Sequence, residues 1–341
     1  MLVVCGGFFD KPWKLYQFQI KGIEFYSSLK DIPKENGFFV FSYSLSAETI
    51  GVKVKSSDLP KIIFVKIGEV KEFNKTYEPV ILEFVSFSLN KEAYLQRVKE
   101  IKREIEKGVV YQINLSTKID FFLEGQPLDL FLKFFQTQKT PYAFFLDLKD
   151  FFIISGSMEL FLQKRGDTIV SKPIKGTAKN RKILEENLKD KAENLMILDM
   201  MRNDLSKIAM VGTVEVKELF KIEEYSTLFQ MHSTVSAKTN AKFEEILLNT
   251  FPPASVTGAP KKKAVEIIDL LEPHPRDYYC GCAGFRLEDD FTLSVLIRTA
   301  FGTKEKLFYF AGSGIVYDSQ EEEEWKETLS KIQAFYSFSS Y

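Results

Sequence analysis

Histidine and cysteine are scarce in this chain of 341 residues, which holds only His232 and His274 and three cysteines, Cys5, Cys280 and Cys282. Three cysteines cannot build a disulfide framework at this length, so we expect a reducing, cytoplasmic environment and buried thiols. Zinc sites draw mainly on His and Cys, so a zinc site is disfavoured. A bound metal would take carboxylate ligands, which favours a hard ion such as Mg²⁺.

An excess of one charge is also missing. Lys and Arg number 46, and Asp and Glu number 47, which leaves a formal net charge of −1. Without a basic block, nucleic acid is not expected as a partner. The most apolar stretch, residues 142–155, is interrupted by Asp147, Lys149 and Asp150, and the first residues lack a basic leader segment. We therefore expect no membrane span and no signal peptide.

Apolar residues are abundant, at 45% of the chain with 32 Phe, which is enough for a large core in one domain or two intimate ones. Runs rich in β-branched and aromatic residues predict strands at 38–45, 61–70, 109–116, 142–148, 282–288, 292–301 and 306–318. Residues 151–156 and 168–173 are expected to form a hairpin-like pair. Strand meanders with few helices favour an α+β fold of antiparallel sheets over a parallel βαβ sheet.

Periodic apolar residues predict five helices. The first begins after Asn90, a plausible N-cap, and ends before Gly108. The others are expected at about 182–204, 242–250, 260–271 and 321–335. We expect the β-rich residues 1–90 to pack into the same globular unit as residues 91–341.

Two of the predicted helices carry paired carboxylates. Asp190 and Glu193 are three residues apart, and Glu324, Glu327 and Lys331 follow at i, i+3 and i+7, so each set shares a helix face. Together they could hold one Mg²⁺, with water or a substrate carboxylate completing the shell. Taken alone, such an acidic run is more typical of a solvated helix start.

Nine motifs in order over residues 90–335 strengthen this interpretation. They are YQINLS (111–116), SMELFL (157–162), KPIKGT (172–177), AENLMILDMMRNDL (192–205), MHSTVS (231–236), FPPASVTGAPKKKAVEII (251–268), YYCGCAGF (278–285), IRTAF (297–301) and AGSGIVYDSQEEEEWKETLSK (311–331). This set closely resembles the chorismate-utilising enzymes, which include the aminodeoxychorismate, anthranilate, isochorismate and salicylate synthases. The resemblance implies a central sandwich of antiparallel sheets with helices outside, chorismate as substrate and Mg²⁺ as cofactor.

The resemblance also implies roles for individual residues. Glu193 and Glu327 match the direct Mg²⁺ ligands, and Asp190 and Glu324 match supporting carboxylates. Arg298 and Tyr279 match residues that hold a substrate carboxylate, for which the guanidinium fork is a suitable donor. Backbone N–H groups of residues 312–314 would face a substrate anion, and His232 would lie near the ring of chorismate. The full set matched to the substrate site is Gln112, Thr177, His232, Tyr279, Arg298, Gly312, Ser313, Gly314 and Lys331.

Three positions discriminate among the family's reactions. Lys175, in PIKGT, is typical of aminodeoxychorismate synthases, where it is implied to attack C2 of chorismate; anthranilate synthases typically carry Ala at this place. Glu159 matches the general acid that protonates the departing C4 hydroxyl. Gln112 replaces a lysine that activates water in isochorismate-forming relatives, and Gln cannot take a proton. Amine chemistry is therefore favoured.

Ammonia has no visible source within the chain. Cys5, Cys280 and Cys282 fit a glutaminase nucleophile poorly, so a separate glutamine amidotransferase subunit or free ammonium is expected to supply it. Residues 1–90 are interpreted as a shortened N-terminal region of the family. Two alternatives stay open: an anthranilate synthase component I, or a chorismate-binding subunit without catalysis.

Overall fold

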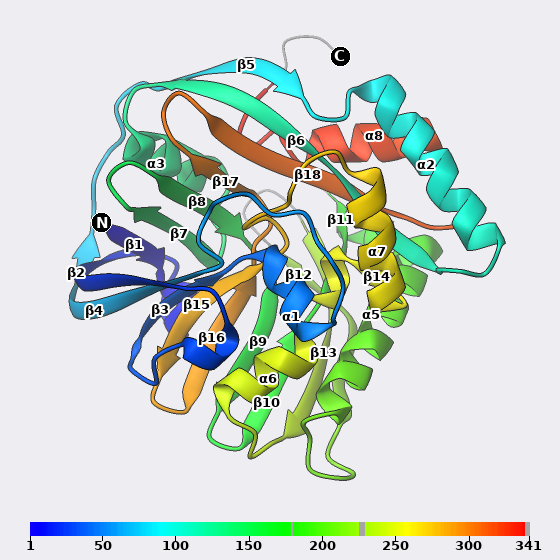
Figure 1. The fold of residues 1–341 in the computed structure, drawn as a ribbon, viewed down its shortest axis with the longest axis horizontal. Coiled ribbons are helices and arrows are strands. Elements are labelled where there is room, and N and C mark those ends of the chain that lie inside the picture. Colours follow the sequence, from blue (N-terminus) through cyan, green and yellow to red (C-terminus); the bar gives the residue numbers. More distant parts are fainter. Residues whose placement is uncertain (179, 225–228, 338–341) are drawn as a thin grey trace.

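The computed structural model describes residues 1–178, 180–224 and 229–337 and contains both strands and helices in quantity (Figure 1). Its strands are β1 Leu2–Cys5, β2 Leu15–Tyr26, β3 Gly37–Phe41, β4 Ile62–Phe73, β5 Ile81–Phe87, β6 Gln112–Glu124, β7 Tyr142–Asp147, β8 Phe152–Ser157, β9 Leu160–Arg165, β10 Thr168–Lys172, β11 Ile174–Ala178, β12 Glu215–Glu224, β13 Phe229–Lys238, β14 Gly258–Ala259, β15 Cys282–Leu287, β16 Asp290–Val295, β17 Thr299–Gly302 and β18 Leu307–Ile315. Its helices are α1 Ser46–Thr49, α2 Lys91–Glu106, α3 Pro127–Thr137, α4 Arg181–Glu186, α5 Leu188–Ser206, α6 Phe243–Thr250, α7 Lys261–Leu271 and α8 Glu321–Ser330.

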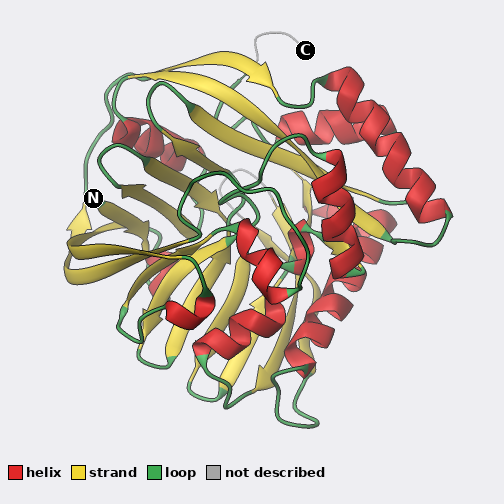
Figure 2. Ribbon diagram, in the orientation of Figure 1, coloured by secondary structure: helices red, strands yellow, loops and turns green. Residues whose placement is uncertain are grey.

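Every strand pairing in the described residues is antiparallel. The pairings run in the order β5, β6, β18, β17, β8, β7, β1, β2, β4, β3, β15, β16, β9, β10 and β13, with β11 and β12 beside β13 and β14 beside β6. The strands occupy the centre and the helices lie around them (Figure 2). The predicted α+β class with antiparallel sheets is confirmed.

Strands of the first 90 residues are built into the same ladders as later strands. β1 pairs with β7, and β3 pairs with β15. Aromatic rings join the same segments, because Phe38 lies 5.0 Å from Phe144 and 4.9 Å from Phe285 between ring centroids. Such rings contribute large buried areas to the core.

Helix α2 follows its sequence prediction closely. The side chain of Asn90 accepts a hydrogen bond from the backbone N–H of Ala93 at 3.0 Å, as an N-cap does. Tyr94, Val98 and Ile101 are buried in a core cluster shared with α7 and α8. The predicted helices at 242–250 and 260–271 are likewise confirmed as α6 and α7.

Three element predictions were wrong in detail. The helix expected at 182–204 is two helices, because Asn187 has an extended backbone and its side chain caps α5. The last helix ends at Ser330 rather than near 335. The expected hairpin partner of β10 is wrong, since β10 pairs with β9 across a turn in which Gly166 has φ 57°.

The three cysteines are buried and not in disulfides, as expected. None of the helices in the described ranges is both long and apolar enough to cross a membrane.

Candidate active site

The predicted nucleophile lies against a glycine of β18. A Cβ added to Gly314 would lie 2.9 Å from Lys175 Nζ, 2.5 Å from Gln112 Nε2 and 3.4 Å from Glu193 Oε2. The absence of a side chain at Gly314 therefore provides the space in which three predicted site residues from β11, β6 and α5 meet.

Lys175 is a mostly buried amine among carboxylates. Its Nζ lies 3.4 Å from Glu193 Oε2. Burial acts to lower the pKa of Lys175, but the negative charges of Glu193, Glu327 and Glu159 outweigh it and hold the pKa above its ordinary value. Sequence alone could not decide which of these influences dominates.

Glu159 is a buried carboxyl group whose pKa is influenced by the charge of Lys175. It is 4% exposed, and burial raises its pKa to about 7, although a hydrogen bond with Ser255 and the charge of Lys175 act in the opposite direction. A carboxyl group with this pKa is partly protonated near neutrality, which is the state that a general acid needs.

Asp190 is held in place at the start of α5. Its backbone N–H donates to Asn187 Oδ1 at 3.0 Å, and Asn187 Nδ2 donates back to Asp190 Oδ2 at 2.7 Å. Gly176, at φ 92°, packs so closely that an added Cβ would lie 2.9 Å from Asp190 Oδ2. Burial, followed by the charges of Glu193 and Glu327, raises the pKa of Asp190 to about 6.

Glu324 is a 2% exposed carboxylate on α8. Its Oε1 accepts hydrogen bonds from Ser319 Oγ at 2.6 Å and from Lys189 Nζ at 3.1 Å. Its Oε2 is buried and has no hydrogen-bond partner among the described residues. Lys189 Nζ also lies 4.0 Å from Glu193 Oε1, so this lysine links the acidic faces of α5 and α8.

Glu327 and Lys331 form an ion pair at the end of α8. Lys331 Nζ donates to Glu327 Oε1 at 2.7 Å and to the carbonyl of Gly312 at 2.6 Å. Burial acts to raise the pKa of Glu327, but Lys331, with Lys175 and Lys189, holds it at about 2. Arg298, which has φ 52°, donates through Nη1 to the carbonyl of Lys331.

The four predicted metal ligands were tested for their fit to Mg²⁺. Hard carboxylate oxygens on two helices, with a buried, unpartnered oxygen on Glu324, are donors of the kind that Mg²⁺ takes. Within the described ranges, however, no three His, Cys, Asp or Glu side chains converge closely enough to hold a metal ion. The donor chemistry fits the ion, while in the structure lysines bind Glu193, Glu324 and Glu327, and Asn187 binds Asp190.

Residues 312–314 lie in β18, which pairs with β6 on one edge. The other edge pairs with β17 only as far as Tyr309, so backbone groups beyond that point have no partner strand within the described residues. The side chain of Ser313 faces away from Gly312 and Gly314 and lies 3.0 Å from Tyr94 in the core. Ser313 could therefore serve a ligand only through its backbone.

Tyr279 and Thr177 differ in exposure, since Tyr279 is buried and Thr177 lies at the surface of β11. Tyr279 is 4% exposed and stacks on Phe310 with 5.2 Å between ring centroids. Phe310 shares a strand face with Gly312, so the Tyr279 ring covers that face beside the site. Thr177 is exposed and pairs in register with Gln230.

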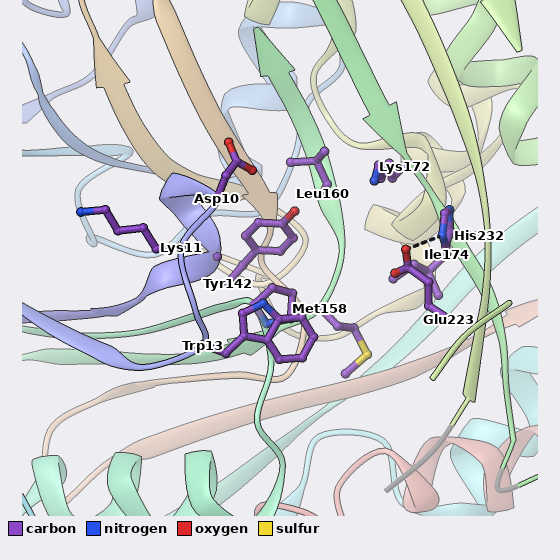
Figure 3. A pocket seen from close by; sticks show the side chains of 12 residues that line it. Asp10, Lys11, Trp13, Tyr142, Met158, Leu160, Lys172, Ile174, Glu223 and His232 are labelled. Carbon is purple, nitrogen blue, oxygen red and sulfur yellow. Dashed lines mark ion pairs between the residues drawn. The ribbon is translucent and has the colours of Figure 1, made fainter. Parts of the chain in front are cut away.

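His232 lines a neighbouring pocket of about 390 Å³ rather than the centre around Lys175 (Figure 3). Its Nε2 lies 3.1 Å from Glu223 Oε1, and the two side chains face one another in the figure. His232 pairs with Ile174 in the β11–β13 register, and both line the pocket, whereas the next residue, Lys175, does not. The full lining is Gly7, Asp10, Lys11, Trp13, Pro141, Tyr142, Met158, Leu160, Lys172, Ile174, Glu223 and His232.

Sequence reasoning missed Lys189, Asn187 and Ser255 as parts of the site. Asn187 could have been found, because Asn three residues before Asp190 is a capping pattern. Ser255 lies inside a quoted motif, but nothing in the sequence joins it to Glu159. Lys189 carries one signal, a cation in the first turn of a helix, where the macrodipole disfavours it.

Comparisons with known proteins agree with the fold and the motifs. A model of the family described as chorismate binding enzyme matches residues 33–337. Aminodeoxychorismate synthase component 1 of Escherichia coli K12 is 36% identical over 258 residues, which cover 72% of this chain and 57% of that protein. Anthranilate synthase component 1 of Saccharolobus solfataricus is 36% identical over 280 residues, covering 78% of this chain and 65% of that protein.

Similarity extends to a solved structure. The crystal structure of anthranilate synthase component I from Streptococcus pneumoniae superposes with a TM-score of 0.81 at 20% identity, over 96% of this chain and 93% of that one. At this identity the likeness concerns the fold. These two curated relatives are matched over 57% and 65% of their own lengths.

Proposed function

This chain belongs to the chorismate binding enzymes, and from that premise we propose that it is an aminodeoxychorismate synthase component 1. It would convert chorismate and ammonia to 4-amino-4-deoxychorismate for 4-aminobenzoate and folate synthesis. The observation that carries the proposal is Lys175, whose amine lies beside Gly314 and 3.4 Å from Glu193. Relatives of both activities are 36% identical to the chain, so the choice between them rests on this residue.

The proposed chemistry divides one difficult substitution into two steps. With Mg²⁺ held by Glu193 and Glu327, part of the negative charge that raises the pKa of Lys175 would be offset, which favours the free amine. As the free amine, Lys175 adds at C2 of chorismate while the C4 hydroxyl departs, and ammonia then adds at C4 and expels the lysine from C2. Glu159 donates a proton to the departing hydroxyl, because hydroxide is a poor leaving group. A pKa of about 7 leaves part of Glu159 in the acid form at neutral pH.

Mg²⁺ is the proposed cofactor, held by Glu193 and Glu327 with Asp190 and Glu324 in support. When bound, it would supply positive charge for a substrate carboxylate beside these acids. Arg298 and Lys331 are proposed to bind carboxylate oxygens, together with backbone N–H groups on the open edge of β18 at residues 312–314. Gln112, Tyr279, Thr177 and His232 stay predictions for the remaining substrate contacts.

Ammonia is proposed to come from a glutamine amidotransferase subunit, with free ammonium as the substitute in vitro. The name "component 1" of the matched relatives is consistent with a partner component. Anthranilate synthase is the second candidate, favoured by the relative from Saccharolobus solfataricus. That reaction would add ammonia at C2 and release pyruvate, which leaves Lys175 without a covalent role.

The test is the identity of the product. Purified protein is incubated with chorismate, Mg²⁺ and ammonium, and the products are separated and identified by mass spectrometry. We expect 4-amino-4-deoxychorismate without pyruvate. Anthranilate with pyruvate would overturn the proposal, and no turnover with or without an added glutaminase would favour a chorismate-binding subunit.

A further inference from the structure

Lys189 stands at a position that helix physics disfavours. It follows Leu188, the first residue of α5, after the N-cap Asn187, so its charge lies at the positive end of the helix dipole. An acidic residue is preferred there, and Asp190 supplies one in the next position. A local rule broken in this way is offset by another interaction, and such exceptions gather at functional sites.

The offsetting interaction is with two buried carboxylates. Lys189 Nζ lies 3.1 Å from Glu324 Oε1 and 4.0 Å from Glu193 Oε1. The lysine side chain is 45% exposed, whereas those of Glu324 and Glu193 are 2% and 11% exposed. A long flexible chain thus reaches in from the surface and neutralises charges that cannot move to solvent themselves.

Two other lysines bind acids of this site: Lys175 binds Glu193, and Lys331 binds the neighbouring Glu327. Lys175 is 16% exposed, and its ammonium is enclosed with Glu193 beside Gly314. Lys331 is tied by a second hydrogen bond to the carbonyl of Gly312. Of these three lysines, Lys189 has the most exposed side chain, at 45% against 16% for Lys175 and 31% for Lys331.

We propose that Lys189 is a resident counter-cation that a divalent metal ion displaces from Glu324 and Glu193. Without metal, its ammonium holds the acidic faces of α5 and α8 together. When Mg²⁺ enters, the stronger double charge takes over the carboxylates and the ammonium swings into solvent, where it is well hydrated. Binding of Mg²⁺ and release of the Lys189 ammonium then occur together. This proposal rests on the metal site of the proposed function.

The first test compares Mg²⁺ affinities by isothermal titration calorimetry, without chorismate. Lys189→Met removes the competitor and should bind Mg²⁺ about fivefold more tightly than the unmodified protein. Lys189→Arg keeps a cation and should not gain affinity. Lys191→Met is the matched control, because Lys191 donates to the carbonyl of Glu185 and should leave affinity unchanged. Equal affinities for Lys189→Met and the unmodified protein would overturn the exchange.

The second test separates displacement from a simple change of local charge. Lysines are labelled with an amine-reactive acylating reagent, and the extent at each is measured by peptide mass spectrometry with and without saturating Mg²⁺. We expect labelling of Lys189 to rise with Mg²⁺ while that of Lys191 stays constant. Unchanged or reduced labelling of Lys189 would overturn the proposal. Neither measurement depends on which product the enzyme forms, so each can fail independently of the proposed reaction.

Discussion

Gly314 contributes to the site because it has no side chain, which leaves space for Lys175 and Gln112. In Gly314→Ala, the new methyl would lie within 3 Å of Lys175 Nζ and Gln112 Nε2. Both neighbours are ends of flexible side chains, so the fold should survive while the nucleophile is displaced. We expect kcat with ammonium to fall about 100-fold with little change in Tm.

Gly22→Ala is the matched control for this glycine, because in that strand the nearest atom to an added Cβ is 3.9 Å away. It should keep full activity. Equal rates for Gly314→Ala and Gly22→Ala would show that the space above Gly314 does not matter to catalysis.

Glu159 predicts a pH dependence of the reaction. The pKa of Glu159 is raised to about 7, so the carboxyl is protonated below that pH and ionised above it. If Glu159 donates the proton, kcat falls as the pH rises through about 7. Glu159→Gln keeps the shape but cannot donate, so it should lower kcat about 100-fold and abolish this limb of the pH profile. An unchanged profile in the variant would remove Glu159 from the proton transfer.

The same group should link stability to pH. Because the folded-state pKa of Glu159 lies above that of the unfolded chain, the contribution of this group to stability is present at low pH and is lost as the pH rises through about 7. Glu159→Gln lacks this loss, so its free energy of unfolding should exceed that of the parent by up to about 3 kcal/mol in alkaline solution. Urea unfolding at acidic and alkaline pH measures the difference, and a gain at acidic pH alone would contradict it.

The position of some site residues could be predicted from the sequence, and that of others could not. Lys175, Gln112 and Glu193 meet as the motifs indicate. The substrate contact of His232 stays a prediction, because strand register determines which side of the sheet this residue faces, and register depends on distant segments. Lys189 carries only its place in the first turn of a helix as a signal, and nothing in the sequence joins it to the buried carboxylates that it reaches.

Among the elements, the cap of α5 connects stability to the site. Asn187→Ala removes the side chain that bonds the N–H and the carboxylate of Asp190, and should cost about 1 kcal/mol. It should also weaken Mg²⁺ binding, because Asp190 loses its anchor. Asn90→Ala removes the equivalent cap of α2 at similar cost and should leave Mg²⁺ affinity intact. Thermal unfolding and metal titration on both variants check the pair; similar losses of affinity would contradict the account.

Local patterns predict elements well where one helix face or one cap decides the outcome, as for α2. They fail where the local sequence is compatible with more than one arrangement of helices or strands. The periodicity of residues 182–204 continues across Asn187, so only the cap geometry reveals the break between α4 and α5. The wrong partner of β10 has a similar cause, because the chain offers several strands and pairing is settled by tertiary packing.

At the scale of the whole molecule, the N-terminal strands and the site share one core. Phe285 is 1% exposed, and its ring lies 4.4 Å to 5.7 Å, between centroids, from those of Phe8, Phe9, Phe18 and Phe38. Phe285→Ala should lower the free energy of unfolding by about 3 to 5 kcal/mol. The protein should still unfold in one transition, with a lower midpoint temperature. Circular dichroism and tryptophan fluorescence should report the same midpoint. Two separated transitions would show that residues 1–90 fold independently.

The overall topology lies beyond local sequence reasoning. The class follows from composition and strand density, but pairings such as β1 with β7 and β3 with β15 join residues more than 130 and 230 positions apart. The family resemblance implied the sandwich of antiparallel sheets, because periodicity identifies single elements but not which of them pair.

The covalent role of Lys175 is the central claim, and intact-mass spectrometry tests it most directly. Chorismate is added with Mg²⁺ but without ammonia, and the adduct is mapped by peptide analysis. We predict an adduct on Lys175 with the mass of chorismate less water, retained in the control Lys172→Ala and absent from Lys175→Ala. An adduct on another residue, or full ammonia-dependent activity in Lys175→Ala, would contradict the account.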